Sequence, residues 1–111
     1  MKQPVSEVEI SEAGPGRTTL RGALTFETAC RAHEAGQRCI EAATTPELEM
    51  DCTDVAESDS AGLVVLLDWL AIARMNQRAI RFTHVPDSLI AVAAISELES
   101  VLGIGLLGIG A

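Results

Sequence analysis

The tetrapeptide Asp59-Ser60-Ala61-Gly62 holds the side chains whose types and spacing best suit chemistry in this chain. It precedes a long apolar run, so Ser60 is placed at the start of a predicted helix, where free N–H groups and partial positive charge favour anions. Asp and Ser are also the usual capping residues, and capping is the simplest interpretation. The alternative is that the Ser60 hydroxyl accepts a phosphoryl group, which adds about two negative charges beside Asp59.

Nucleophilic chemistry at Ser60 is not indicated by the sequence. A serine nucleophile needs a general base, and the two histidines, His33 and His84, are predicted on a different helix and at a strand end. The sequence contains no GxSxG, P-loop or kinase motif. We therefore expect no catalytic residues, and the chain is predicted not to be an enzyme.

A glycine-rich stretch from Gly103 to Gly108 fits the GxGxxG pattern. A dinucleotide site also needs a helix after the motif and an acidic residue about 20 positions further on. The sequence stops at Ala111. We therefore expect residues 103–111 to be an apolar, Gly-rich tail or a segment that lies in a groove of a partner, and no cofactor is predicted.

Metal binding is not predicted either. Cys30 and His33 have i,i+3 spacing, but no second pair of ligands follows. The three cysteines, Cys30, Cys39 and Cys52, are expected to be reduced thiols buried in a cytoplasmic protein. Residues 47–59 hold six acids and no base. We interpret that stretch as a solvated rim or a docking surface for Arg and Lys rather than a Mg²⁺ site.

The chain's 111 residues fit one domain, and its net charge of −8 limits the choice of partners. Negative charge disfavours a nucleic-acid backbone, and the lack of a basic cluster disfavours an anionic membrane surface. The chain starts without a secretory signal, and no near-uncharged stretch reaches the roughly 20 residues that span a bilayer. We expect a cytoplasmic protein whose core is built from Ala, Val, Leu and Ile, because aromatic residues are scarce.

The hydrophobic pattern predicts the element order β-β-α-β-α-β-α. The predicted strands cover 5–10, 17–21, 47–52 and 79–85, and the predicted helices cover 26–43, 61–77 and 87–97. A turn at Gly14-Pro15-Gly16 joins the first two strands as a hairpin, Thr25 caps the first helix, and a loop runs from Thr53 to Asp59. Helices placed between parallel strands indicate an α/β sandwich.

The predicted helix at 61–77 is apolar on both sides. One side carries Leu63, Leu66, Leu67, Leu70 and Ala73, and the other carries Ala61, Val64, Asp68, Ala71, Ile72 and Met75. The outer side of a surface helix is normally polar. Either both sides are buried, or the second side is a strip for a partner. In a single-sheet domain of this size, we favour the partner strip.

The stretch from Leu48 to Val55, followed by Asp59-Ser60-Ala61-Gly62-Leu63, resembles the signature of the STAS family. Its members have a strand, a short loop and Asp-Ser/Thr-x-Gly-Leu at the start of an apolar helix. Residues 22–29 are similar to the family's loop into its first helix, and residues 79–87 match its next strand and turn. The resemblance implies a STAS domain at 1–102, a mixed β-sheet with helices packed mainly on one face, and a separate tail at 103–111.

STAS domains include anti-sigma-factor antagonists, sulfate-transporter tails and the small subunit of the Mla phospholipid-transport ABC system. Thr25 stands where antagonists usually carry an aspartate, and the aliphatic helix is more similar to the Mla subunit. The resemblance therefore favours a non-catalytic subunit that docks on the ATPase of an Mla-like complex, which serves outer-membrane lipid asymmetry. Such a subunit reaches the membrane only through its partners.

The alternative is an anti-sigma-factor antagonist that an anti-sigma kinase phosphorylates on Ser60. In both cases the resemblance implies a partner-binding surface near the start of the apolar helix. We expect that surface to comprise Thr25, Asp59, Ser60, Ala61, Gly62, Val64 and Asp68.

Overall fold

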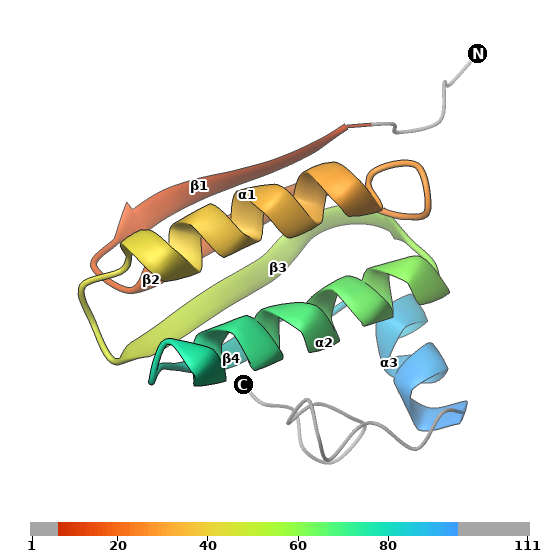
Figure 1. The fold of residues 1–111 in the computed structure, drawn as a ribbon. Helices are drawn as coiled ribbons and strands as arrows, with labels where there is room; N and C mark the ends of the chain where they lie inside the picture. Colours follow the sequence, from red (N-terminus) through yellow and green to blue (C-terminus); the bar gives the residue numbers. More distant parts are fainter. Residues whose placement is uncertain (1–6, 96–111) are drawn as a thin grey trace.

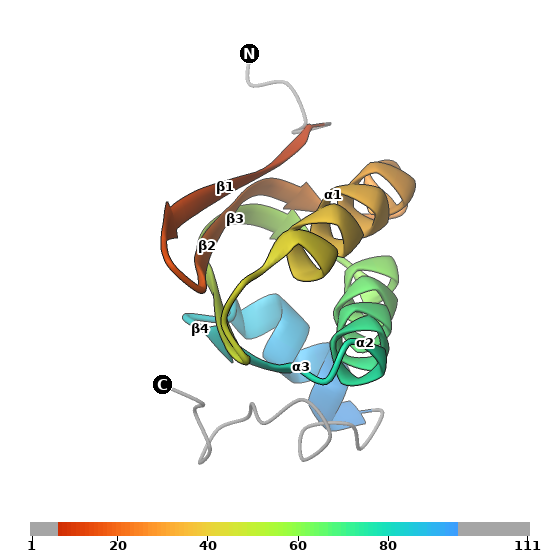
Figure 2. The ribbon, with the colours of Figure 1, turned by 60° about the vertical axis from the view of Figure 1, so that its left-hand side comes forward.

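The predicted element order is confirmed in the computed structural model, which describes residues 7–95. The strands are β1 (Val8–Gly14), β2 (Arg17–Leu24), β3 (Glu47–Ser58) and β4 (Ala79–Thr83), and the helices are α1 (Ala29–Ala42), α2 (Ser60–Met75) and α3 (Asp87–Ile95). β1 and β2 are antiparallel, whereas β2–β3 and β3–β4 are parallel. The sheet is therefore mixed, in the order β1-β2-β3-β4. Its helices lie on one side (Figure 1, Figure 2), as predicted.

The third strand is longer than the sequence pattern indicates. A loop was expected from Thr53 to Asp59, but β3 continues to Ser58 beside β2. The register between these strands shifts twice, between Thr19 and Arg21 and between Gly22 and Ala23. Irregular pairing of this kind breaks the two-residue alternation of side chains, which is the signal that identifies a strand from sequence.

The first helix begins later than predicted, at Ala29 instead of residue 26. Thr25 therefore does not cap it. The structural N-cap position is Thr28, whose side chain makes no capping bond to α1. The Thr28 hydroxyl instead donates to the carbonyl oxygen of Ala23 at 2.7 Å, because the segment between β2 and α1 folds back on the strand end.

The hairpin between β1 and β2 is present, but its strands are displaced from the predicted ranges. β1 runs to Gly14, and the turn is made by Pro15 and Gly16. Gly16 has a φ of +72°, a conformation that glycine adopts without steric cost. β4 ends at Thr83, two residues earlier than expected.

Two aromatic residues, Trp69 and Phe82, are the largest fully buried side chains. The core is built mainly from Ala, Val, Leu and Ile, as expected, but these two aromatic side chains also belong to it. Aliphatic residues complete the core from both layers, among them Leu20, Leu24, Ile40, Leu66 and Leu89.

Trp69 occupies the space between α1 and α2. A Cβ atom added to Gly36 of α1 would overlap the Trp69 indole, so the two helices meet at this glycine. The indole Nε1–H donates to the His33 carbonyl oxygen at 3.3 Å. A large side chain on α2 is thus matched to a missing side chain on α1, and α1 and α2 lie side by side (Figure 1, Figure 2).

Helix α2 buries a somewhat different face from the predicted one. Its buried residues are Gly62, Leu63, Val65, Leu66, Trp69 and Ala73. Leu67 and Leu70, which the helical spacing places on the same side as Leu63 and Leu66, are only half-buried. The outer side exposes Val64, Asp68, Ala71 and Met75, which recur at intervals of three or four residues. This strip is solvent-accessible, so α2 is not buried on both sides.

The three cysteines differ in exposure, and none forms a disulfide. Cys52 is buried as expected and Cys39 is partly buried, but Cys30 is exposed. The expectation of a buried thiol at Cys30 is wrong because that residue lies on the outer side of α1 near its first turn. Burial, followed by the charge of Asp51, raises the pKa of Cys52 to about 12, so this thiol stays protonated at neutral pH.

Within residues 7–95, none of the helices is long and apolar enough to cross a bilayer. The tail expected at 103–111 and the boundary expected at residue 102 lie outside the described residues, as do residues 5–6 of the first predicted strand and the end of the helix expected at 87–97.

The contact at Gly36 gives a testable prediction for stability. Gly36→Ala gains helix propensity, which stabilises by about 1 kcal/mol, but places a methyl group against the Trp69 ring. Overpacking of this kind costs about 1–3 kcal/mol. With an overlap this close, we expect a net loss of about 1–2 kcal/mol in the free energy of unfolding. Urea denaturation followed by the fluorescence of Trp69, the chain's single tryptophan, measures it.

The matched control is Arg38→Ala, an exposed substitution two residues along α1. It should change stability by less than about 0.5 kcal/mol. Equal stability of Gly36→Ala and the wild type would show that α1 and α2 can separate at this point without cost.

Candidate functional site

Asp59 joins the start of α2 to the segment that follows β2. Its Oδ1 accepts the backbone N–H of Ala61 at 2.8 Å and that of Gly62 at 3.4 Å, so Asp59, not Ser60, is the helix cap. Its Oδ2 accepts the backbone N–H of Phe26 at 3.1 Å. One carboxylate therefore satisfies donors of two segments that are 33 positions apart in the sequence.

Gly62 allows α2 to start directly against the end of β2. A Cβ atom at this position would overlap the carbonyl group of Leu24. The same carbonyl oxygen accepts the backbone N–H of Asp59 at 3.1 Å. The glycine of the tetrapeptide is thus required by packing, and it fixes where the first turn of α2 emerges from the sheet.

The segment between β2 and α1 is held from inside by Thr28, which is fully buried. Its hydroxyl accepts the backbone N–H of Thr25 at 3.0 Å while it donates to the carbonyl oxygen of Ala23. We name residues 25–28 the β2–α1 turn. Because Thr28 and Asp59 both bind its backbone, the turn is fixed next to the start of α2.

Ser60 is exposed, and its hydroxyl makes no hydrogen bond with any other residue in the described part of the chain. The site therefore offers an accessible hydroxyl beside a capped helix N-terminus. Neither histidine contacts it: His33 Nε2 lies 3.6 Å from Asp68 Oδ2, and His84 Nδ1 lies 3.2 Å from Asp51 Oδ1. Within residues 7–95, neither histidine is placed to serve as the base that a serine nucleophile requires.

An open groove of about 380 Å³ runs between the N-terminal halves of α1 and α2. We name it the α1/α2 groove, and it is lined by Ala29, Cys30, His33, Glu34, Ala61, Val64, Val65 and Asp68. Val64 leaves 55% of its surface exposed, and the His33–Asp68 pair spans the two helices. The lining is mostly apolar, with polar groups at its margins.

The structure brings most of the predicted site residues together at one end of the α1–α2 pair. Ala61, Val64 and Asp68 line the groove. Asp59 and Ser60 lie at the N-terminus of α2, directly before Ala61. Thr25 belongs to the adjacent β2–α1 turn, and Gly62 is buried against Leu24 at the end of β2. The sequence does not reveal the contacts of Phe26 and Thr28, because nothing in the spacing of these residues distinguishes a turn from the first turn of a helix.

Two acidic residues of β3, Glu49 and Asp51, interact with side chains of the same chain. Glu49 Oε1 accepts from Arg81 Nη2 at 2.7 Å, and Glu49 Oε2 lies 3.8 Å from Arg17 Nη2. Hydrogen bonds from the hydroxyl and backbone N–H of Thr53, with a smaller contribution from His84, lower the pKa of Asp51. These groups face away from the helices, and no cluster suited to a metal ion occurs in residues 7–95.

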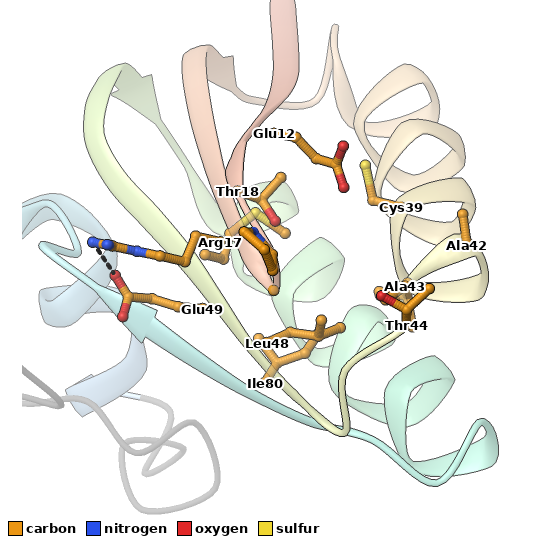
Figure 3. A pocket seen from close by; sticks show the side chains of 14 residues that line it. Glu12, Arg17, Thr18, Cys39, Ala42, Ala43, Thr44, Leu48, Glu49 and Ile80 are labelled. Carbon is orange, nitrogen blue, oxygen red and sulfur yellow. Dashed lines mark ion pairs between the residues drawn. The ribbon is translucent and has the colours of Figure 1, made fainter.

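A second, smaller cavity of about 100 Å³ lies at the C-terminal end of α1 (Figure 3). The Cys39 thiol and the Glu12 carboxylate face each other across it, with the Arg17–Glu49 ion pair at its outer margin. Burial and then the charge of Glu12 raise the pKa of Cys39, which keeps its thiol protonated and poorly nucleophilic at neutral pH. None of the predicted site residues lines this cavity.

The two roles of Asp59 can be separated by substitution. Asp59→Asn keeps one oxygen that can cap α2, but its amide group cannot accept the N–H of Phe26. Asp59→Ala removes both interactions. We expect Asp59→Ala to lose about 1–2 kcal/mol of stability and Asp59→Asn to lose less.

Amide hydrogen exchange provides the readout for each bond. In Asp59→Asn, the Phe26 amide should exchange faster while the Ala61 amide stays protected. In Asp59→Ala, both should exchange faster. Unchanged protection of Phe26 in both variants would show that Asp59 does not hold the β2–α1 turn.

Comparisons with known proteins agree with this architecture. A family model described as "Mlab, STAS domain" matches residues 11–107. The structure of the anti-sigma factor antagonist SpoIIAA in its unphosphorylated form is similar, with a TM-score of 0.66, 11% identity, and coverage of 85% of this chain and 84% of that chain. The Bacillus cell fate determinant SpoIIAA in the phosphorylated form gives a TM-score of 0.63, 11% identity, and coverage of 85% and 86%.

No curated protein matches the chain. The likeness to the SpoIIAA structures, at 11% identity, shows the fold. The family match covers most of the sequence and includes both the tetrapeptide 59–62 and the β2–α1 turn. The chain therefore belongs to the MlaB-type family of STAS-domain proteins.

Proposed function

We propose that this protein is a non-catalytic subunit that docks on the ATPase of an Mla-like phospholipid-transport ABC complex and supports its assembly. The docking surface comprises Asp59, Ser60, Ala61, Val64 and Asp68, together with Thr25 in the adjacent turn. The buried Gly62 supports this surface by letting α2 start directly against β2. The protein lies on the cytoplasmic side and meets the membrane only through this complex. Residues 1–102 form the binding domain in this proposal, and residues 103–111 are a separate apolar tail.

The α1/α2 groove is the observation that carries the proposal. An apolar, open surface between two helices suits burial against another protein, since removal of apolar area from water drives association. Val64 lies on this surface and leaves more than half of its area exposed. The membership in the MlaB-type family supports an ATPase as the partner.

The mechanism follows from the state of Ser60. An uncharged hydroxyl at the start of α2 costs far less to bury against a partner than a charged group does, and a polar group of the partner can bond to it. A phosphoryl group or carboxylate there adds charge next to Asp59, whose carboxylate already interacts with the first N–H groups of α2. Burying two neighbouring negative charges is unfavourable, so negative charge at Ser60 weakens the contact.

Anti-sigma-factor antagonism is the second candidate, and one observation favours it. The fold is similar to SpoIIAA in structures of both its unphosphorylated and its phosphorylated forms, and Ser60 is exposed. In that case a cognate kinase with ATP phosphorylates Ser60, and Ser60→Ala abolishes the modification. Thr25, which replaces the aspartate usual in antagonists, favours the transporter role.

The test is an affinity capture from the native host, with quantitative mass spectrometry of the bound proteins. The wild type should recover an ABC ATPase with its permease. Ser60→Asp and Val64→Lys should each reduce recovery about tenfold or more, because each introduces a charge into an apolar contact. A small kinase-like anti-sigma protein in place of the ATPase would support the second candidate.

Matched controls carry the same chemical change elsewhere. Ser11→Asp places a carboxylate on exposed β1, and Met75→Lys places a lysine at the far end of the exposed α2 strip. Both should bind like the wild type. ATPase recovery that is equal for the wild type, Ser60→Asp and Val64→Lys would contradict the docking surface.

A further inference from the structure

Phe26 is a large apolar side chain that the fold leaves in solvent. Its side chain is 84% exposed, whereas the other two aromatic residues, Trp69 and Phe82, are the largest members of the core. The residue lies in the β2–α1 turn, three positions before Ala29, and Ala29 lines the α1/α2 groove. A lone exposed phenyl group is unremarkable in itself, so its setting decides whether it has a role.

The backbone of Phe26 is held more firmly than that of an ordinary surface turn. Its N–H donates to Asp59 Oδ2, and the buried Thr28 hydroxyl binds the neighbouring Thr25 N–H. Asp59 also binds Ala61, which lines the groove. The phenyl group is therefore presented from a fixed turn beside the groove, so a partner that binds it has little backbone entropy to remove.

The charges around Phe26 define what can approach it. Acidic residues occupy the turn, the groove walls and the α2 cap: Glu27, Glu34, Asp59 and Asp68. Within residues 25–34 and 59–68 the sequence contains one Arg or Lys, Arg31. A protein surface that covers this region without repulsion must carry basic residues around an apolar centre.

We propose that Phe26 is the aromatic anchor of the docking surface, and that it inserts into an apolar pocket of the ATPase subunit whose rim carries Lys or Arg. This inference rests on the proposed function. It adds the residue of this chain that provides most of the apolar contact. It also adds the chemistry of the partner's surface, which is an apolar pocket with a basic rim. Aromatic residues that fill a partner's pocket at the centre of an interface dominate its affinity, and charged rims govern encounter and salt dependence.

The test measures the affinity of purified ATPase subunit for the full chain by isothermal titration calorimetry. Phe26→Ala should weaken binding at least about tenfold, as truncation of an anchor residue does. Its thermal unfolding should match the wild type, because the side chain is exposed. Wild-type binding should also weaken as salt is raised, and Phe26→Ala should keep that salt dependence because the lost contact is apolar.

Met75→Ala is the matched control, since Met75 is 82% exposed and lies at the opposite end of α2. It should bind within about twofold of the wild type. If the wild type binds the ATPase and Phe26→Ala binds equally well, the anchor is overturned while the proposed function stands. If the wild type does not bind the ATPase, the proposed function fails and the anchor fails with it.

Discussion

The close contact between α1 and α2 at Gly36 and Trp69 is the packing constraint on which the rest of the structure depends. Because Gly36 has no side chain, the indole fills the space between the helices and bonds to the His33 carbonyl oxygen. This contact brings the N-terminal halves of α1 and α2 close enough for their outer residues to form one groove. Gly62 acts similarly between α2 and β2, so two missing side chains determine where the first turn of α2 lies.

Sequence patterns predicted the fold better than the local structure of the site. The order of elements followed from alternating and helical periods, and Asp59-Ser60-Ala61-Gly62 was correctly placed at the start of a helix. The extension of β3 to Ser58 was missed because irregular register with β2 disrupts alternation. The role of Thr28 is not visible in the sequence because its partners are backbone groups of its own turn and of the end of β2, which no side-chain pattern reports.

The polar groups of the candidate site are used mainly to fix backbone, and this shapes the function that we propose. Asp59 binds N–H groups of the β2–α1 turn and of α2, and Thr28 binds an N–H of the turn and a carbonyl oxygen of β2. What remains accessible is the Ser60 hydroxyl, the apolar groove and Phe26, within an acidic surround. Such a surface suits recognition of another protein, and the single hydroxyl at its edge is the position where added charge alters binding most.

The location of the partner-binding surface is the central claim, and hydrogen–deuterium exchange of the chain with and without purified ATPase subunit tests it most directly. Our account predicts new protection in residues 25–34 and 59–68, which form the β2–α1 turn, the first half of α1 and the first half of α2. Residues 49–53 and 81–84 carry the ion pairs Arg81–Glu49 and His84–Asp51 on the sheet face opposite the helices, and their exchange should be unchanged. Protection confined to that sheet face, with the turn and groove unaffected, would contradict the account.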